Sequence, residues 1–248
     1  MNYCLKNILI LGLLVFPALG FSQISDETPK EVIYKFENSG FLEFHSNGWG
    51  IGYRTGKFTN GYKKKTYDFS FSSVTDLKQI KQSTSYTMTG SRFIYGKTLN
   101  FYNIKALIGT QKVITTKPYW GGVEFRKFLF GGINLGIGKP VYLYIYNYID
   151  GNIVSLEKFD PDKYDFQDIY AKGPFSKGLD ELKFYPGLSL KTGINVEYGI
   201  ETEKAKSVEI GGIIDVYPIP VQIMAYENPK YAMFAIYLSF HFGKRYNK

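Results

Sequence analysis

Cysteine, histidine and long apolar runs are scarce in this chain, which has one Cys and two His among 248 residues. Cys4 precedes the only extended apolar run, so we expect neither a disulfide nor a zinc-thiolate centre in the mature protein. That run, 8–21, has 14 residues, too few for a helix that must cross about 30 Å of hydrocarbon. A disulfide scaffold and a helical membrane protein are therefore both excluded.

The first 22 residues have the pattern of a secretory signal peptide. Lys6 precedes the apolar run, which ends in small residues, and Gly20 and Ser22 fit the positions before a cut at Gln23. We therefore predict a signal peptide at 1–22 and one domain at 23–248. Removing Lys6 with the peptide lowers the net charge from +8 to +7. Because the chain is exported, we expect no nucleic-acid partner and favour anionic lipid instead.

Strands are the structural signal of the mature chain, because 18% of its residues are aromatic and apolar residues alternate with polar ones. In NGWGIGYR, at 47–54, one face carries large side chains and the other carries glycines and Arg54. Glycines gain little from facing water but suit a cramped interior. We therefore predict an inside-out barrel whose apolar face meets lipid. The predicted lipid-facing residues are Trp49, Ile51, Tyr53, Phe69, Ile133, Leu190, Ile210 and Leu238.

The opposite face combines glycine with charges of both signs. Buried charges are tolerated when they are paired and hydrogen-bonded, which a narrow barrel lumen allows. The predicted lumen network consists of Arg54, Asp68, Glu124, Arg126, Lys191, Glu197, Glu209 and Asp215. We expect the three cations to pair with the five carboxylates. The alternative is a soluble barrel or sandwich with the charged face in water, since alternation alone does not separate the two.

The fold prediction is all-β: an antiparallel transmembrane β-barrel of eight strands, with ten or twelve as alternatives if 75–118 holds more turns. One option splits 119–148 at Lys139-Pro140 and begins the barrel at 41–54. We favour a second option, which has strands at 31–37 and 41–54, a bulge between Phe44 and Asn47, and a single long strand at 119–148. This arrangement puts 75–91, 150–182 and 218–230 outside as long loops. It leaves 55–61, 114–118 and 200–206 as short periplasmic turns.

Eight strands leave an interior filled by side chains, which argues against a porin unless the strand count is higher. A second alternative is an outer-membrane lipid hydrolase. Ser239 and His241 share a strand face and could act as nucleophile and base, with Glu209 as the acid. Because this face meets the lumen and not lipid, we expect no enzyme activity.

The long loop 150–182 is the predicted partner-binding segment, since aromatic residues exposed on a loop suit a protein interface. It carries Tyr164, Phe166, Tyr170 and Phe175 among acidic residues. The same loop holds weak candidate calcium ligands, Asp160, Asp162 and Asp165, followed by Asp168. Tyr164 stands where an EF-hand needs a ligand, so we expect a solvated acidic loop without metal. GINLGIGK at 132–139 fails the phosphate-loop pattern, and no cofactor is expected.

Several stretches resemble a family of small outer-membrane β-barrel proteins from the Bacteroidota, of poorly characterised function. They are GWGIGYRTGK (48–57), YGK (95–97), QKVI (111–114), KPYWGGVEFR (117–126), LGIGKPVYL (135–143), FYPG (184–187) and LSFHFGK (238–244). The resemblance implies a barrel in the outer membrane of a Gram-negative cell, with no established enzyme activity. By analogy of compartment, we expect an accessory or scaffold subunit of a barrel-assembly or type IX secretion machine. Its partners would be outer-membrane lipid and other outer-membrane or periplasmic proteins.

Overall fold

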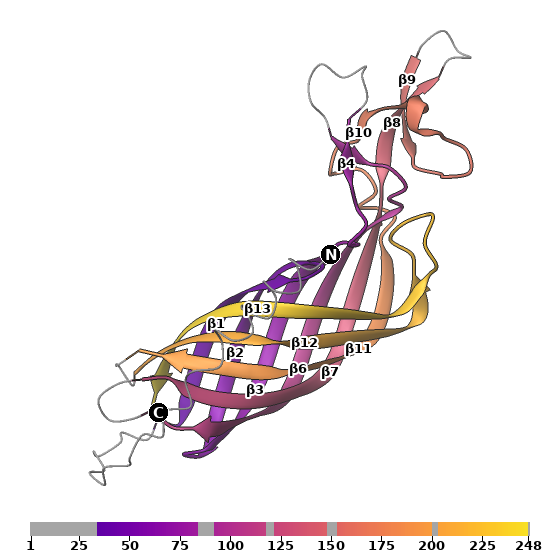
Figure 1. Ribbon diagram of the computed structural model, residues 1–248. Helices are drawn as coiled ribbons and strands as arrows, with labels where there is room; N and C mark the ends of the chain where they lie inside the picture. Colours follow the sequence, from indigo (N-terminus) through magenta and orange to yellow (C-terminus); the bar gives the residue numbers. More distant parts are fainter. Residues whose placement is uncertain (1–33, 84–91, 118–121, 148–152, 200–202, 248) are drawn as a thin grey trace, which may run out of the picture. The chain divides into compact units, whose positions relative to one another are not determined.

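The computed structural model describes residues 34–83, 92–117, 122–147, 153–199 and 203–247, which are organised around one closed β-barrel. Eight antiparallel strands lie side by side in it (Figure 1). They are β1 (Phe36–His45), β2 (Gly48–Asn60), β3 (Lys63–Val74), β6 (Leu99–Thr115), β7 (Glu124–Pro140), β11 (Lys183–Tyr198), β12 (Lys204–Val221) and β13 (Lys230–Tyr246). The predicted eight-stranded antiparallel barrel is confirmed. The predicted signal peptide lies outside the described residues.

The first and last strands pair and close the ring, in a register that runs from Phe36↔Tyr246 to His45↔Tyr237. Closure leaves none of the eight strands with a free edge. We call the end where β1 begins and β13 ends the turn end; its connections are 61–62, 116–123 and 199–203. The opposite, loop end carries the connections 75–98, 141–182 and 222–229, together with a two-residue turn at 46–47.

The predicted boundaries of the first two strands are wrong. β1 covers Phe36–His45, and a tight turn at Ser46 and Asn47 leads directly into β2. The phase change that we attributed to a bulge is this hairpin turn. Gly48, which pairs with His45 directly after the turn, has φ +154°, and a Cβ on it would lie 1.9 Å from the Ser73 carbonyl oxygen.

The predicted single strand 119–148 is also divided in the structure. β7 ends at Pro140 and β8 (Tyr142–Asn147) begins two residues later, leaving the barrel for a different sheet. Pro140 still pairs with Leu99 of β6, whereas the pairing with β11 stops at Gly138. Proline is tolerated here because one side of the strand has already lost its partner.

The segment 150–182, predicted to be one long loop, contributes two strands to a small sheet. β9 (Ile153–Lys158) and β10 (Ile169–Lys172) flank β8 in the order β10-β8-β9, and a 3-10 helix, η1 (Phe166–Asp168), precedes β10. We call this unit the loop-end sheet. A second pair, β4 (Lys81–Gln82) and β5 (Phe93–Ile94), lies in the 75–98 connection. No helix in the described ranges is long and apolar enough to cross a membrane.

The loop-end sheet has its own apolar cluster. Its buried members are Phe93, Val141, Leu143, Ile145, Phe159, Tyr164 and Ile169, and Phe166 packs against them. We missed this unit because its strands are short, and periodicity over so few residues is weak.

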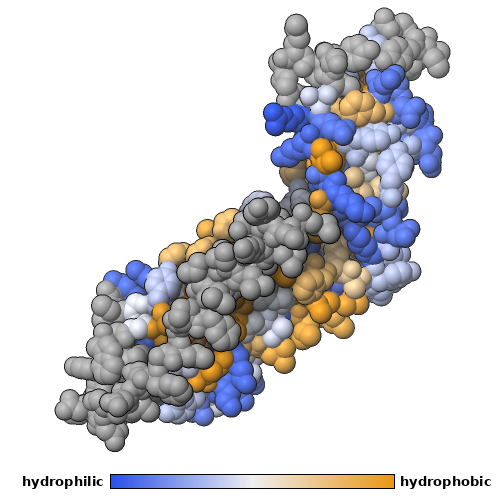
Figure 2. Space-filling model, in the orientation of Figure 1, coloured by the Kyte–Doolittle hydropathy of each residue, from blue (hydrophilic) through white to orange (hydrophobic). Residues whose placement is uncertain are grey.

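The two faces of the barrel wall differ in the way the alternation predicts. The eight predicted lipid-facing side chains all lie on the outer face, each 39 to 65% exposed. Figure 2 shows hydrophobic residues over the barrel strands and mainly hydrophilic ones over the loop-end sheet. An exposed apolar band around a closed barrel with charges inside is the architecture of a membrane-spanning barrel.

Glycines on the inner face make room for large side chains that fill the lumen. A Cβ on Gly52 would lie 2.3 Å from the Phe41 ring, and one on Gly136 would lie 2.4 Å from the Phe101 ring. Real side chains do not approach so closely. These glycines are therefore required by the packing of the interior.

Candidate functional site

The centre of the lumen is an ion cluster around Arg54, which reaches inward from β2. Its guanidinium donates to Asp68 from Nε at 2.8 Å and Nη2 at 2.6 Å, and to Glu209 from Nη1 at 2.6 Å. Lys191 bonds Glu43 and lies 3.8 Å from Asp68 and 4.0 Å from Glu209. All five side chains are almost fully buried. Each charge therefore has a partner of opposite sign, as burial requires.

A second ion cluster, near the turn end of the lumen, surrounds Arg126 and Arg245. Arg126 bonds Glu124 and lies 3.0 Å from Glu197 and 3.7 Å from Glu37. Arg245 donates to Glu37 at 2.9 Å and also bonds Glu197. Lys64 bonds Glu37 and Lys117 donates to Glu197 at 2.8 Å. The shared carboxylates join β1, β7, β11 and β13 across the barrel.

A third group, nearer the loop end, contains Asp215, and here the predicted pairing is wrong. None of the three predicted cations pairs with Asp215 among the described residues; its ion-pair partner is Lys105 of β6, at 2.9 Å. Ser189 also donates to it, and Asn103 donates at 3.1 Å. Lys105 reaches Asp215 because the strands are staggered around the barrel, which the pattern along one strand does not encode.

Five further members of the lumen network were not predicted from the sequence: Glu37, Glu43, Lys64, Lys105 and Arg245. Glu37 and Glu43 were missed because the first strand was placed too early and their common face was split. Lys105 lies on β6, where the inward-facing Asn103, Lys105 and Leu107 alternate with outward-facing residues. This alternation could have identified Lys105.

Side chains fill much of the described lumen. Between the central and turn-end clusters, a void of about 10 Å³ remains, bordered by Arg54, Lys64, Gln111 and His241 among others. Such a void holds at most about one water molecule. The arrangement cross-braces the strands and fills the barrel.

Ser239 and His241 do lie together, with 2.9 Å between Oγ and Nε2. The same Nε2 faces Glu209 at 3.6 Å, whereas a catalytic triad needs the acid on the other ring nitrogen. Both side chains are buried in the lumen, and Glu209 is already bound to Arg54 and accepts from Tyr237 at 2.8 Å. The void beside His241 among the described residues is about 10 Å³, too small for a lipid substrate.

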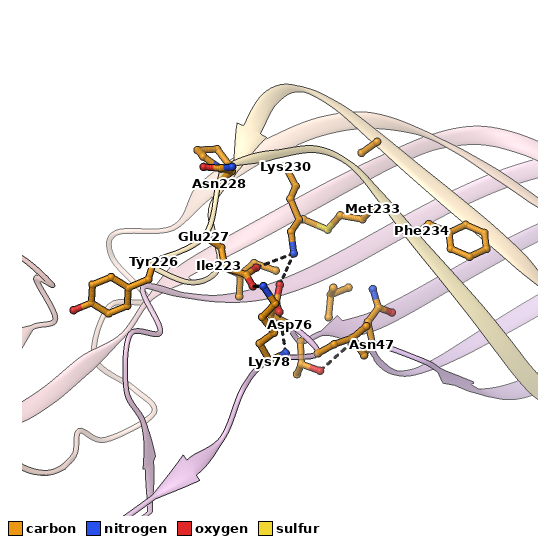
Figure 3. A pocket seen from close by; sticks show the side chains of 15 residues that line it. Asn47, Asp76, Lys78, Ile223, Tyr226, Glu227, Asn228, Lys230, Met233 and Phe234 are labelled. Carbon is orange, nitrogen blue, oxygen red and sulfur yellow. Dashed lines mark hydrogen bonds and ion pairs between the residues drawn. The ribbon is translucent and has the colours of Figure 1, made fainter. Parts of the chain in front are cut away.

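A pocket with a volume of about 580 Å³ lies at the loop end. We call it the mouth pocket. Lys230 extends toward Asp76 at 2.6 Å and Glu227 at 2.9 Å, and Lys78 lies 2.8 Å from Glu227 (Figure 3). Val74, Ile223 and Met233 provide apolar lining. The two cations and two carboxylates balance, so the pocket is amphipathic without a net charge from these groups.

The predicted partner-binding aromatics are not all exposed. Tyr164 is buried and Phe166 packs against the same cluster, so these two stabilise the loop-end sheet. Tyr170 is half-buried and stacks on Tyr146. Phe175 alone of the four is largely exposed, and nearby Leu179 is exposed as well. The prediction of four exposed aromatics is therefore corrected to one.

The acidic residues of this segment organise local backbone. Asp160 accepts from the amide of Asp162 at 3.1 Å, and the Asp168 side chain accepts from the amide of Asp165 at 2.9 Å, as part of a capping box. In the part of the chain that the structure describes, no cluster of three or more His, Asp or Glu could hold a metal.

Comparison with known proteins gives structural likeness only. No protein-family model and no curated protein sequence matches the chain. Among solved structures, it is similar to Neisserial surface protein A, with TM-score 0.40 and 9% identity over 85% of this chain and 96% of that one. It is also similar to the N-terminal β-barrel domain of Pseudomonas aeruginosa OprF, with TM-score 0.34 and 11% identity over 84% of this chain and 96% of that one. A third similar structure is Ail of Yersinia pestis, with TM-score 0.34 and 7% identity over 84% of this chain and 95% of that one. Such distant likenesses carry no argument about function, which rests on the chain's own geometry.

Proposed function

We propose that this chain is an integral outer-membrane β-barrel that acts as a non-enzymatic scaffold or accessory subunit of a membrane protein complex. The observation that carries the proposal is a lumen closed by paired charges inside a barrel with an apolar exterior. A filled barrel transports nothing of the size of a nutrient. The surfaces left for function are therefore those outside the membrane, above all the loop-end sheet and the mouth pocket.

The distribution of charge on the barrel wall supports the membrane location. Every Asp and Glu of the eight strands is buried or half-buried on the lumen side. The outer face at the turn end instead carries an exposed collar of lysines: Lys57, Lys63, Lys65, Lys112, Lys127, Lys204, Lys206 and Lys244.

Several collar lysines are directly opposite one another, as in Lys57↔Lys65, Lys112↔Lys127 and Lys204↔Lys244. Like charges in register are unfavourable in water. The collar is favourable where lipid phosphates surround it, which supports anionic lipid as a partner and a headgroup layer at the turn end.

The lipid-hydrolase alternative rests on the 2.9 Å contact between Ser239 and His241. Their burial, and the approach of Glu209 to the wrong ring nitrogen, favour a structural role within the lumen. We therefore propose that the chain has no hydrolase activity. Phospholipid and lipid A profiles of cells with equal amounts of folded wild type and Ser239→Ala should be the same, and a changed profile would favour the hydrolase.

The scaffold proposal is tested by extracting the tagged full-length protein in mild detergent and identifying what co-purifies. We expect a membrane protein in stoichiometric amount. A double variant, Phe175→Ala with Leu179→Ala, removes two exposed apolar side chains of 64% and 48% exposure and should reduce the recovery of that partner. Tyr62→Ala, which removes a side chain of 63% exposure at the turn end, is the matched control. Purification of the wild-type protein alone would contradict a scaffold role.

A further inference from the structure

Lys97 is a buried cation at the loop end that the lumen network does not include. It lies just before β6, where its backbone bridges to Met224 and the amide of Ala225 donates to the Gly96 carbonyl at 2.7 Å. These contacts fix the position of Lys97 beneath the connection between β12 and β13. Its side chain is only 9% exposed. Buried lysines normally have a carboxylate partner.

No carboxylate of the described residues forms an ion pair with Lys97. Its ammonium donates only to the neutral side-chain oxygen of Gln79, at 3.3 Å. The Gln79 amide orientation is fixed by this contact, because Lys97 has only donors and must face the oxygen. The Gln79 Nε2 group is then buried without a hydrogen-bond partner among the described residues. Two neighbouring donor groups are therefore buried with too few acceptors.

Two further cations, Lys172 and Lys81, act on Lys97. Burial, followed by the positive charges of Lys172 and Lys81, lowers the pKa of Lys97 to about 8. The carboxylates of the adjacent connections, Asp76 and Glu227, are engaged by Lys230 and Lys78. Lys97 is therefore in a locally positive environment.

We propose that Lys97, Gln79, Lys81 and Lys172 form a binding site for a phosphate group. A phosphate supplies several acceptor oxygens, enough for the ammonium protons of Lys97 and for the unpaired amide of Gln79. A phosphate group also carries a charge of up to −2, so it balances several cations better than the single negative charge of a carboxylate does. Because the site lies at the loop end of a membrane barrel, the phosphate comes either from a lipid headgroup or from free phosphate. The site is independent of the scaffold role proposed above.

The test is the effect of added anions on the unfolding of the full-length protein in neutral detergent micelles. We compare inorganic phosphate, phosphatidic acid in mixed micelles, and acetate, all at equal ionic strength. Phosphate or phosphatidic acid should raise the unfolding midpoint of the wild type in a saturable manner, because a ligand that binds only the folded state stabilises it. A response to phosphatidic acid alone identifies a lipid headgroup, and a response to both identifies the phosphate group itself.

Variants show whether the response comes from this site. Lys97→Met keeps the length of the side chain and should weaken phosphate binding at least about tenfold, as expected for one lost hydrogen bond to a charged group. Lys172→Met changes an exposed residue, so it should fold normally and also weaken binding. Lys78→Met, at an exposed lysine already paired with Glu227, is the control and should bind as wild type does. The proposal is overturned if the wild type responds to neither phosphate probe, if acetate acts equally, or if Lys172→Met and Lys97→Met both respond like wild type.

Discussion

Replacing Arg54 with methionine is the most direct test of the charged lumen. Arg54 is 3% exposed and its two carboxylate partners, Asp68 and Glu209, are fully buried. Removing the guanidinium leaves both carboxylates facing the same space, with Lys191 at 3.8 and 4.0 Å as the nearest remaining cation. Lys191 is itself bonded to Glu43 and cannot neutralise three carboxylates.

The expected loss in the free energy of unfolding is about 3–5 kcal/mol, the cost of leaving one member of a buried ion pair uncompensated. Loss of the contact between the guanidinium and the Phe130 ring, 4.8 Å apart, acts in the same direction. As the control, Lys158→Ala breaks a 2.6 Å pair with Glu181 in which both side chains are about half exposed. Exposed pairs contribute about 0–1 kcal/mol, so this variant should unfold almost like wild type.

Urea unfolding of the protein in lipid vesicles, followed by tryptophan fluorescence, measures both losses. A triple variant that combines Arg54→Met with Asp68→Asn and Glu209→Gln should recover at least half of the stability, because it removes the stranded charges. Equal unfolding midpoints for Arg54→Met and Lys158→Ala would refute the view that paired charges hold the lumen together. Failure of the triple variant to recover any stability would show that packing, and not charge, causes the loss.

Three further measurements examine the exterior, the lumen and the loop end. Ile133→Lys places a charge at a position on the outer wall where the side chain is 65% exposed, and it should lower the free energy of unfolding by about 2–4 kcal/mol near the bilayer midplane. Tyr62→Lys at the turn end should lower it little. Equal effects of the two variants would contradict a lipid-facing wall. In planar bilayers, the wild type should give no steady conductance, because the void in its lumen is about 10 Å³, and regular channel steps would show an open pore. Burial alone would raise the pKa of Asp76, but hydrogen bonds from the Lys230 side chain and the Lys78 amide lower this pKa overall. The ionised Asp76 carboxylate therefore stabilises the fold above its unfolded pKa of about 3.9, and this stabilisation is lost as the pH falls from there through the lower folded pKa. The stability difference between wild type and Asp76→Asn should therefore be present at pH 7 and should vanish as the pH falls below about 4.

The alternation of apolar and polar residues predicted which way the wall residues face, because a two-residue period directly reports the two environments of a strand. It also predicted eight strands, because most of them are followed by a recognisable connection. The strand boundaries were harder to predict from the sequence. Ser46-Asn47 closes a hairpin within what we predicted to be one strand, and β7 and β8 lie in different sheets although Val141 alone separates them. Those outcomes depend on which neighbour pairs with each segment.

The ion pairs inside the lumen depend on contacts across the barrel, which no local pattern encodes. Arg54 meets Glu209, 155 residues away, and Lys191 meets Glu43, 148 residues away. The inward direction of Arg54, Lys191 and Glu209 follows from the alternation on their own strands. Their partners follow from the stagger of the eight strands, which sets the height of each residue along the barrel axis. Asp215 shows the difference, because it faces inward as predicted but is bound by Lys105.

The sorting of charge between the two sides of the wall links this interior to the membrane. With the carboxylates of all eight strands committed to the lumen, the outward charges on these strands are lysines, concentrated at the turn end. In a soluble barrel, acidic residues on the outer face would relieve the repulsion between pairs such as Lys112↔Lys127. Their place on this wall is taken by apolar side chains. We propose that a layer of lipid phosphates beside the apolar band supplies further counter-charges to this positive collar.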